Sequence, residues 1–183
     1  MAAPQRALMP PEHTVPHQSA VLAPLYMSPH GIALLLTRRS LTLSHHKGQV
    51  CFPGGRADKA DQTLIETALR ETEEELGIHT RHVRILGSIT PLYVAASQNI
   101  VYPVVGWMAS LPPLYPNAYE VAKVLKIPLQ TFLNPETQSN YELHYNGQIT
   151  YAPCYQVGED CIWGATAMML SELLDIIDGM LTA

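Results

Sequence analysis

Cysteine is scarce in this sequence, and its spacing matches neither a disulfide framework nor a zinc site. The chain of 183 residues contains three cysteines, Cys51, Cys154 and Cys161, and no two of them form a C-x-x-C pair. An odd number at such spacing favours reduced thiols over a set of disulfides. We interpret all three as core or surface residues rather than catalytic nucleophiles. A domain of this length buries roughly 70% of its unfolded surface, so its core should need neither cross-links nor structural zinc.

Long apolar runs are also lacking. No segment approaches the length of a transmembrane helix, and residues 1–15 contain no apolar stretch of signal-peptide length. We therefore expect a cytoplasmic protein without a membrane partner. The formal net charge of −5 gives no general reason to expect nucleic-acid binding. The sequence leaves a homodimer open.

Acidic residues are absent from one stretch of the chain. Between Thr37 and Ala57 there is no aspartate or glutamate. The same stretch contains six basic or histidine residues: Arg38, Arg39, His45, His46, Lys47 and Arg56. An acidic protein would need such local positive charge to bind a polyphosphate. The alternative is that these side chains solvate a loop, and for Arg38, His45 and His46 the two interpretations carry equal weight.

Turn-forming residues divide the chain into short strands and two long helices. Residues 1–18 are rich in proline and polar side chains and indicate an extended or disordered arm, which leaves one domain at residues 19–183. The pattern predicts strands at 21–26, 32–37, 83–89 and 100–108, a hairpin of 141–145 and 148–151, and helices at 60–76 and 165–180. These elements favour an α+β fold: an α/β/α sandwich whose mixed central sheet is covered on both faces.

The first predicted helix carries a cluster of glutamates. A buried stripe is expected at helical spacing, formed by Ile65, Ala68, Leu69, Thr72 and Leu76. Gly77 supplies the stop signal. At 100° per residue, Glu71, Glu74 and Glu75 project within about 100° of one another and largely away from that stripe. Glu73 points elsewhere.

Three neighbouring carboxylates repel one another unless something compensates their charge. Divalent cations are the obvious compensation, and oxygen ligands without cysteine or histidine suit Mg²⁺ or Mn²⁺ better than zinc. The alternative is a solvated acidic face, which is the more common meaning of an arbitrary E-x-x-E-E pattern. The surrounding segments decide between the two interpretations.

Three segments together resemble a known hydrolase family. They are LLTRRS (35–40), GQVCFPGGRAD (48–58) and RETEEELGI (70–78). The strand, loop and helix that they predict resemble the Nudix box. More closely, they are similar to the coenzyme A pyrophosphatase subgroup, whose signature reads LLTxRS and then GxVxFPGGxxD before the box. The resemblance extends from about Ala20 to the C-terminal helix and includes IWGATA (162–167), which is similar to a W-G-x-T-A segment there.

The chain departs from the family pattern at a few positions. Between Gly55 and Arg70 there is one residue more than in the general Nudix spacing, an insertion that the subgroup shares. Gln62 stands where the box normally has glutamate, and Thr72 replaces the usual apolar residue. Ser44 replaces an arginine of the subgroup's spacer, a departure that bears on the substrate more than on the fold.

The resemblance implies roles for particular residues. Glu71, Glu74 and Glu75 would bind the metals, with the Gly55 carbonyl as a further ligand. Arg70 would organise them, through ion pairs that are available along the helix to Glu66 and Glu74.

Catalytic and substrate-binding residues are implied in the same way. Glu74, Glu75, Arg70 and Glu120 would form the catalytic set, where Glu120 belongs to an N-x-x-E-V segment (117–121) and could reach the metals or activate water. Arg39, Arg56, Gly54 and Gly55 would bind substrate. The two glycines allow the backbone to bend sharply and approach a ligand closely.

The implied activity is hydrolysis of a diphosphate linkage in a small molecule. By resemblance, the substrate is coenzyme A or acyl-coenzyme A, and the products are 3′,5′-ADP and 4′-phosphopantetheine or its acyl derivative. One alternative is a Nudix hydrolase of another nucleoside diphosphate compound, such as ADP-ribose. Another is a non-catalytic module that senses a nucleotide, against which the intact E-x-x-E-E argues.

Overall fold

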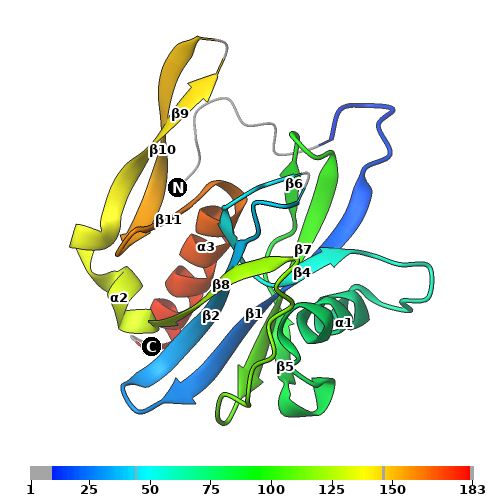
Figure 1. Cartoon of the computed structure of the whole chain (residues 1–183), viewed down its shortest axis with the longest axis vertical. Helices are drawn as coiled ribbons and strands as arrows, with labels where there is room; N and C mark the ends of the chain where they lie inside the picture. Colours follow the sequence, from blue (N-terminus) through cyan, green and yellow to red (C-terminus); the bar gives the residue numbers. More distant parts are fainter. Residues whose placement is uncertain (1–9, 44, 146, 182–183) are drawn as a thin grey trace.

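The computed structural model describes residues 10–43, 45–145 and 147–181 (Figure 1). Ser44 and residues 1–9 of the predicted N-terminal arm lie outside the described residues, and the first strand begins at His17. In the part of the chain that is described, no helix is long and apolar enough to cross a membrane.

A mixed eight-stranded sheet forms the body of the molecule. Its strands are β1 (His17–Ser28), β2 (Gly31–Arg39), β3 (Val50–Cys51), β4 (Gly54–Arg56), β5 (Arg84–Ser88), β6 (Leu92–Val94), β7 (Asn99–Met108) and β8 (Val121–Pro128). The order β3-β2-β1-β7-β5 forms the main path, with β4 pairing β1, β6 pairing β7 and β8 pairing β2. The β1–β7 pair is parallel and the other pairs are antiparallel, so the predicted mixed sheet is confirmed.

A smaller antiparallel sheet and the helices complete the fold. The second sheet, in the order β11-β10-β9, contains β9 (Gln138–Tyr145), β10 (Gln148–Val157) and β11 (Asp160–Trp163). The helices are α1 (Leu64–Leu76), α2 (Leu129–Leu133) and α3 (Gly164–Leu181), with short 3₁₀ turns at η1 (Thr80–His82) and η2 (Pro135–Thr137). The expected strands, the hairpin and the C-terminal helix are therefore confirmed, while β6, β11 and α2 add to them.

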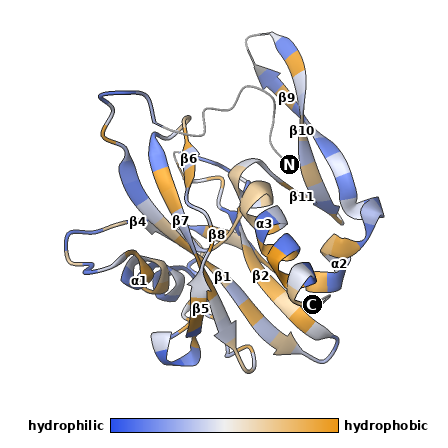
Figure 2. Ribbon diagram, turned by 180° about the vertical axis from the view of Figure 1, so that it is seen from behind, coloured by the Kyte–Doolittle hydropathy of each residue, from blue (hydrophilic) through white to orange (hydrophobic). Residues whose placement is uncertain are grey.

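The two long helices cover opposite faces of the large sheet. Successive residues of a strand point to opposite sides, so alternate residues of β1 pack toward different helices. Ala20 and Leu22 of β1 pack with Ala68 of α1, whereas Ala23 and Leu25 belong to the cluster that includes α3. Figures 1 and 2 show α1 and α3 on either side of β1 and β2, whose ribbons carry bands of apolar residues. The predicted α/β/α sandwich is confirmed.

Helix α1 begins later than predicted, and its buried face agrees with the predicted stripe at Ala68, Thr72 and Leu76 but not throughout. Thr63 is its N-cap and accepts a hydrogen bond from the Glu66 amide, so the helix starts at Leu64 rather than at residue 60. Ile65 is 42% exposed, which corrects its place in the predicted buried stripe. The buried positions are Thr67, Ala68, Thr72, Glu75 and Leu76, and Gly77 ends the helix with a positive φ of 70° as expected.

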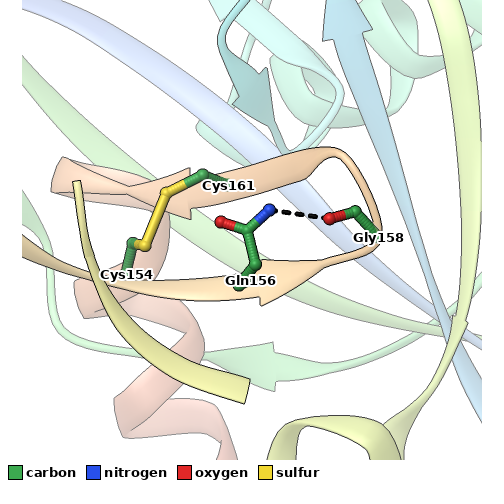
Figure 3. The surroundings of a disulfide bond; sticks show 4 residues. All are labelled: Cys154, Gln156, Gly158 and Cys161. Atoms are coloured by element: carbon green, nitrogen blue, oxygen red, sulfur yellow. Dashed lines mark hydrogen bonds between the residues drawn. A yellow bond between two sulfur atoms is a disulfide. The ribbon is translucent and has the colours of Figure 1, made fainter. Parts of the chain in front are cut away.

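The expectation that all three cysteines are free thiols is wrong for two of them. Figure 3 shows a disulfide between Cys154 of β10 and Cys161 of β11, and only Cys51 is free. Strands β10 and β11 pair antiparallel, with Gln156 opposite Cys161. Cys154 lies two residues before Gln156, so the two cysteines lie on adjacent strands and near each other. Gln156 closes the turn by donating from Nε2 to the Gly158 carbonyl at 2.7 Å.

Candidate active site

The Gly54-Gly55 strand runs directly beside the acidic face of α1. Gly54 pairs with Val21 of β1 and adopts φ 149°, and a Cβ there would overlap the Ala20 carbonyl and the Val21 backbone. A Cβ on Gly55 would overlap the Glu71 carboxylate. Close approach to the backbone of β1 therefore requires glycine at position 54, whereas a side chain at position 55 would displace the Glu71 carboxylate, against which the Gly55 backbone lies.

Two carboxylates beside this strand, from Glu71 and Glu75, have raised pKa values, and the charge of Glu120 acts on both. Burial raises the pKa of Glu75 to about 8; Arg39 opposes this rise, and the charges of Glu120 and Glu71 add to it. Burial likewise raises the pKa of Glu71, which Arg70 lowers and the charges of Glu74 and Glu120 raise. The mutual influence places all three acids in one electrostatic unit.

Glu75 is the most buried member, with a side chain only 3% exposed. The sequence placed it outside the buried stripe, and the structure corrects this: Glu75 lies in the interface between α1 and the sheet. Arg39 Nη1 lies 3.7 Å from Glu75 Oε1. Glu75 Oε2 and Arg39 Nε are buried and have no hydrogen-bond partner among the described residues. This buried pair is incompletely satisfied, which is characteristic of a site that is completed by a ligand.

Arg70 organises the acidic face, chiefly through a residue that the sequence did not assign. Arg70 Nε and Nη2 donate to the two carboxylate oxygens of Asp61 at 3.0 and 2.9 Å, and Nη1 donates to Glu71 at 2.9 Å. The pKa of Asp61 is held well below its usual value, chiefly because its carboxylate accepts these Arg70 hydrogen bonds. A carboxylate just before the N-cap Thr63 was the available signal. Asp61 rather than Gln62 supplies this charge.

The expected ion pairs of Arg70 along the helix form only in part. Glu74 accepts from Arg70 Nη1 at 3.2 Å, and its side chain is 56% exposed. Glu66 turns away and accepts from the Gln62 amide at 2.7 Å. Glu73, expected to point elsewhere, borders a cavity of about 360 Å³ that Asp61, Arg70 and Glu74 also line and that Glu71 and Glu75 do not.

Asn117 contacts Glu120 and holds it near the C-terminal end of α1. No individual role was assigned to Asn117 from the sequence. The backbone N–H of Asn117 donates to the backbone carbonyl of Glu75 at 2.9 Å, and the side-chain Nδ2 of Asn117 donates to Glu120 Oε1 at 3.3 Å. The backbone of Glu120 is fixed from the other side, because the Ser40 amide donates to the Glu120 carbonyl at 2.8 Å. The LLTRRS segment, the C-terminal end of α1 and the N-x-x-E-V segment therefore meet at one point.

A cleft of about 850 Å³ lies beside Arg39, Gly54 and Gly55, and among the described residues that line it there is none of Glu71, Glu74, Glu75 and Glu120. Arg39, Gly54, Gly55 and Arg56, the four residues predicted to bind substrate, all line it. His46 lines it as well, with Nδ1 2.9 Å from Gln49 Oε1.

Arg38 forms ion pairs within the protein instead of offering its charge to a polyphosphate. Its Nη1 lies 3.3 Å from both Glu159 Oε1 and Asp160 Oδ1. Lys123 of β8 lies 3.0 and 2.8 Å from the same two carboxylates. Arg38 therefore joins the large sheet to the β10–β11 turn and is not available to a phosphate in the cleft.

Comparison with known proteins agrees with this architecture. Residues 16–108 match the NUDIX domain family model. The chain is 40% identical over 155 residues to an uncharacterized Nudix hydrolase, NudL, of Photorhabdus laumondii, covering 85% of this chain and 82% of that protein. A NudL of Yersinia pestis is 40% identical over 158 residues, covering 85% and 77% of the two chains.

Solved structures share the fold at low identity. The Nudix hydrolase RenU of M. smegmatis has a TM-score of 0.63 at 16% identity, covering 90% of this chain and 87% of its own. The NUDIX domain of Shewanella oneidensis NrtR, solved with ADP ribose, has a TM-score of 0.59 at 15% identity and covers 94% and 93%.

The fold and the family match together define a hydrolase that acts on diphosphate-containing small molecules. The chain belongs to the Nudix hydrolase family. Enzymes of this family generally use divalent metal ions such as Mg²⁺.

Proposed function

We propose that this Nudix hydrolase cleaves the diphosphate of coenzyme A or acyl-coenzyme A, giving 3′,5′-ADP and 4′-phosphopantetheine or its acyl derivative. The observation that supports this choice of substrate is that the two segments similar to the coenzyme A subgroup meet at the acidic site. LLTRRS contributes Arg39, 3.7 Å from Glu75, and Ser40, bonded to the Glu120 backbone. GQVCFPGGRAD contributes Gly55 against Glu71. A Nudix box alone does not distinguish diphosphate substrates, whereas these segments resemble one subgroup.

The donor set fits Mg²⁺ or Mn²⁺. Glu71, Glu74 and Glu75 would hold the ions together with the Gly55 carbonyl, all through oxygen atoms as hard cations prefer. The buried Glu75 Oε2 without a hydrogen-bond partner supports this assignment, because a cation would satisfy it and remove the repulsion among the acids. No three histidine, cysteine or acidic side chains within the described ranges are already clustered to hold an ion, and Glu74 is paired with Arg70.

Divalent cations would supply Lewis acidity and lower the pKa of the attacking water. The protein groups divide the remaining tasks. Glu120, held by Asn117, would accept the proton of the water. Arg70 would keep Glu71 oriented, and Arg39 and Arg56 would bind phosphate oxygens at the entrance of the cleft.

Catalytic efficiencies for coenzyme A, its 3′-dephosphorylated form and ADP-ribose, measured side by side at one Mg²⁺ concentration, test the proposal. We expect coenzyme A to be cleaved most efficiently, because the Arg56 guanidinium offers positive charge that the 3′-phosphate can use. Efficient ADP-ribose cleavage with inert coenzyme A would overturn the substrate while leaving a Nudix hydrolase. Tight nucleotide binding without turnover of any compound would favour the sensor alternative.

A further inference from the structure

Part of the lining of the cleft comes from residues to which the proposed mechanism gives no role. Its charged and imidazole lining residues, Arg39, His46 and Arg56, all come from the segment between β2 and β4. From Val94 onward every lining residue is uncharged. All of the charged and imidazole lining therefore comes from one segment of the chain, and the lining from Val94 onward, here called the uncharged end, carries no charge.

Three elements that are distant in sequence supply the uncharged end. Ala95 and Ala96 come from the turn between β6 and β7, Leu143 and Ala152 from the second sheet, and Met169 from α3. Figure 1 shows the second sheet and α3 next to each other on the same side of the large sheet. The small sheet is thus one wall of the substrate cleft, and its groups there are chiefly aliphatic.

Two of the polar or aromatic groups at this end, Asn99 and Trp163, are already engaged within the protein. Asn99 accepts from Ser19 Oγ at 3.0 Å and donates to the Ser97 carbonyl at 3.1 Å. The Trp163 ring is stacked on Tyr141, with ring centroids 4.8 Å apart and an interplanar angle of 11°. A nucleobase seeks free hydrogen-bonding groups and a stacking surface, whereas an alkyl chain needs only apolar contact. The lining favours an alkyl chain.

We infer that the uncharged end holds the acyl group of an acyl-coenzyme A, and that Ala96 and Ala152 set the length of chain that it accepts. This inference rests on the proposed coenzyme A function. The cleft of about 850 Å³ lies in the upper part of the range of about 300–1,000 Å³ for ligand sites, so it has room for more than a nucleoside diphosphate. Small side chains at these two positions leave that room open.

The test is a series of free, acetyl-, butyryl-, hexanoyl- and octanoyl-coenzyme A with the whole chain and Mg²⁺. Each methylene that enters the aliphatic end should lower KM by about two- to fourfold, while kcat changes little because the contact is equal in ground and transition states. A KM that is independent of chain length, in an enzyme that cleaves free coenzyme A, overturns the inference alone. Failure to cleave any member overturns the proposed function, and the inference with it.

Substitutions inside and outside the cleft test where the acyl group binds. Ala96 is exposed on a turn, so Ala96→Trp should fold and fill part of the cleft. We expect it to raise KM for octanoyl-coenzyme A by at least about tenfold and to change KM for free coenzyme A by less than about threefold. Leu86→Trp on exposed β5, outside the cleft, is the matched control and should keep the wild-type dependence on chain length. Equal losses for both substrates in Ala96→Trp would overturn the assignment.

Discussion

Replacing Glu75 by glutamine should stabilise the metal-free protein at alkaline pH, because the native fold buries this carboxylate with too few partners. Its pKa is raised from 4.5 to about 8, mainly by burial. Between these pH values the unfolded chain has lost the proton while the folded chain retains it, so stability falls as pH rises through this window. Above about pH 8 the fold contains the charged form and the loss is complete. Glutamine keeps the volume and removes the titration.

The magnitude follows from the same values. Between pH 5 and pH 9, a pKa of 4.5 in the unfolded chain and about 8 in the fold corresponds to about 4 kcal/mol of lost stability. Relaxation around the buried charge reduces this to roughly 2–4 kcal/mol. The pKa of about 8 already includes the attraction of Arg39 for the charged carboxylate, so the ion pair that the Glu75→Gln variant lacks at pH 9 is counted in this difference.

Urea unfolding in EDTA at pH 5 and pH 9, followed by tryptophan fluorescence, measures the effect. The free energy of unfolding of Glu75→Gln relative to wild type should be more favourable at pH 9 than at pH 5 by roughly 2–4 kcal/mol. Glu73→Gln removes the same charge from the same helix and is the control. If both variants show the same difference between the two pH values within about 1 kcal/mol, Glu75 is not a strained buried acid and the reasoning fails.

Three further substitutions test the surroundings of the site. Gly55→Ala should displace the Glu71 carboxylate and lower kcat/KM by at least about tenfold, with a small change in Tm, and unchanged kinetics would contradict the close approach. Asp61→Asn should raise the Mg²⁺ concentration needed for half-maximal rate and lower kcat/KM by about tenfold, since Arg70 loses its bidentate partner; a Mg²⁺ titration decides this. Asp160→Asn should lower Tm by about 2–6 °C without changing KM for coenzyme A, and a changed KM would place Arg38 at the substrate.

Much of the fold follows from local pattern. The β-branched runs, the turn residues and the stop at Gly77 each depend on neighbours a few positions away, and the structure has them where expected. The face that α1 turns to the sheet does not follow from such pattern. Ile65 is more apolar than Thr72, yet Ile65 is exposed and Thr72 is buried.

The candidate site was predictable as a set of residues but not as an arrangement. Helical geometry gives the relative directions of Glu71, Glu74 and Glu75, and it cannot say that Glu75 is buried while Glu74 is exposed. The Asp61 clamp on Arg70 requires the loop before α1 to fold back onto the helix. The Cys154–Cys161 pair similarly depends on strand register rather than on spacing.

Turnover of coenzyme A by wild type, Glu75→Gln and Glu73→Gln at saturating Mg²⁺ tests the central claim most directly, because the two variants remove one charge each from the same helix two residues apart. The account predicts that 3′,5′-ADP forms with wild type and, within a few-fold of that rate, with Glu73→Gln. Glu75→Gln should be slower by at least about a hundredfold, with its fold intact by melting temperature. Near-wild-type rates for Glu75→Gln, or equal losses in the two variants, would contradict the assignment of the buried carboxylate to catalysis.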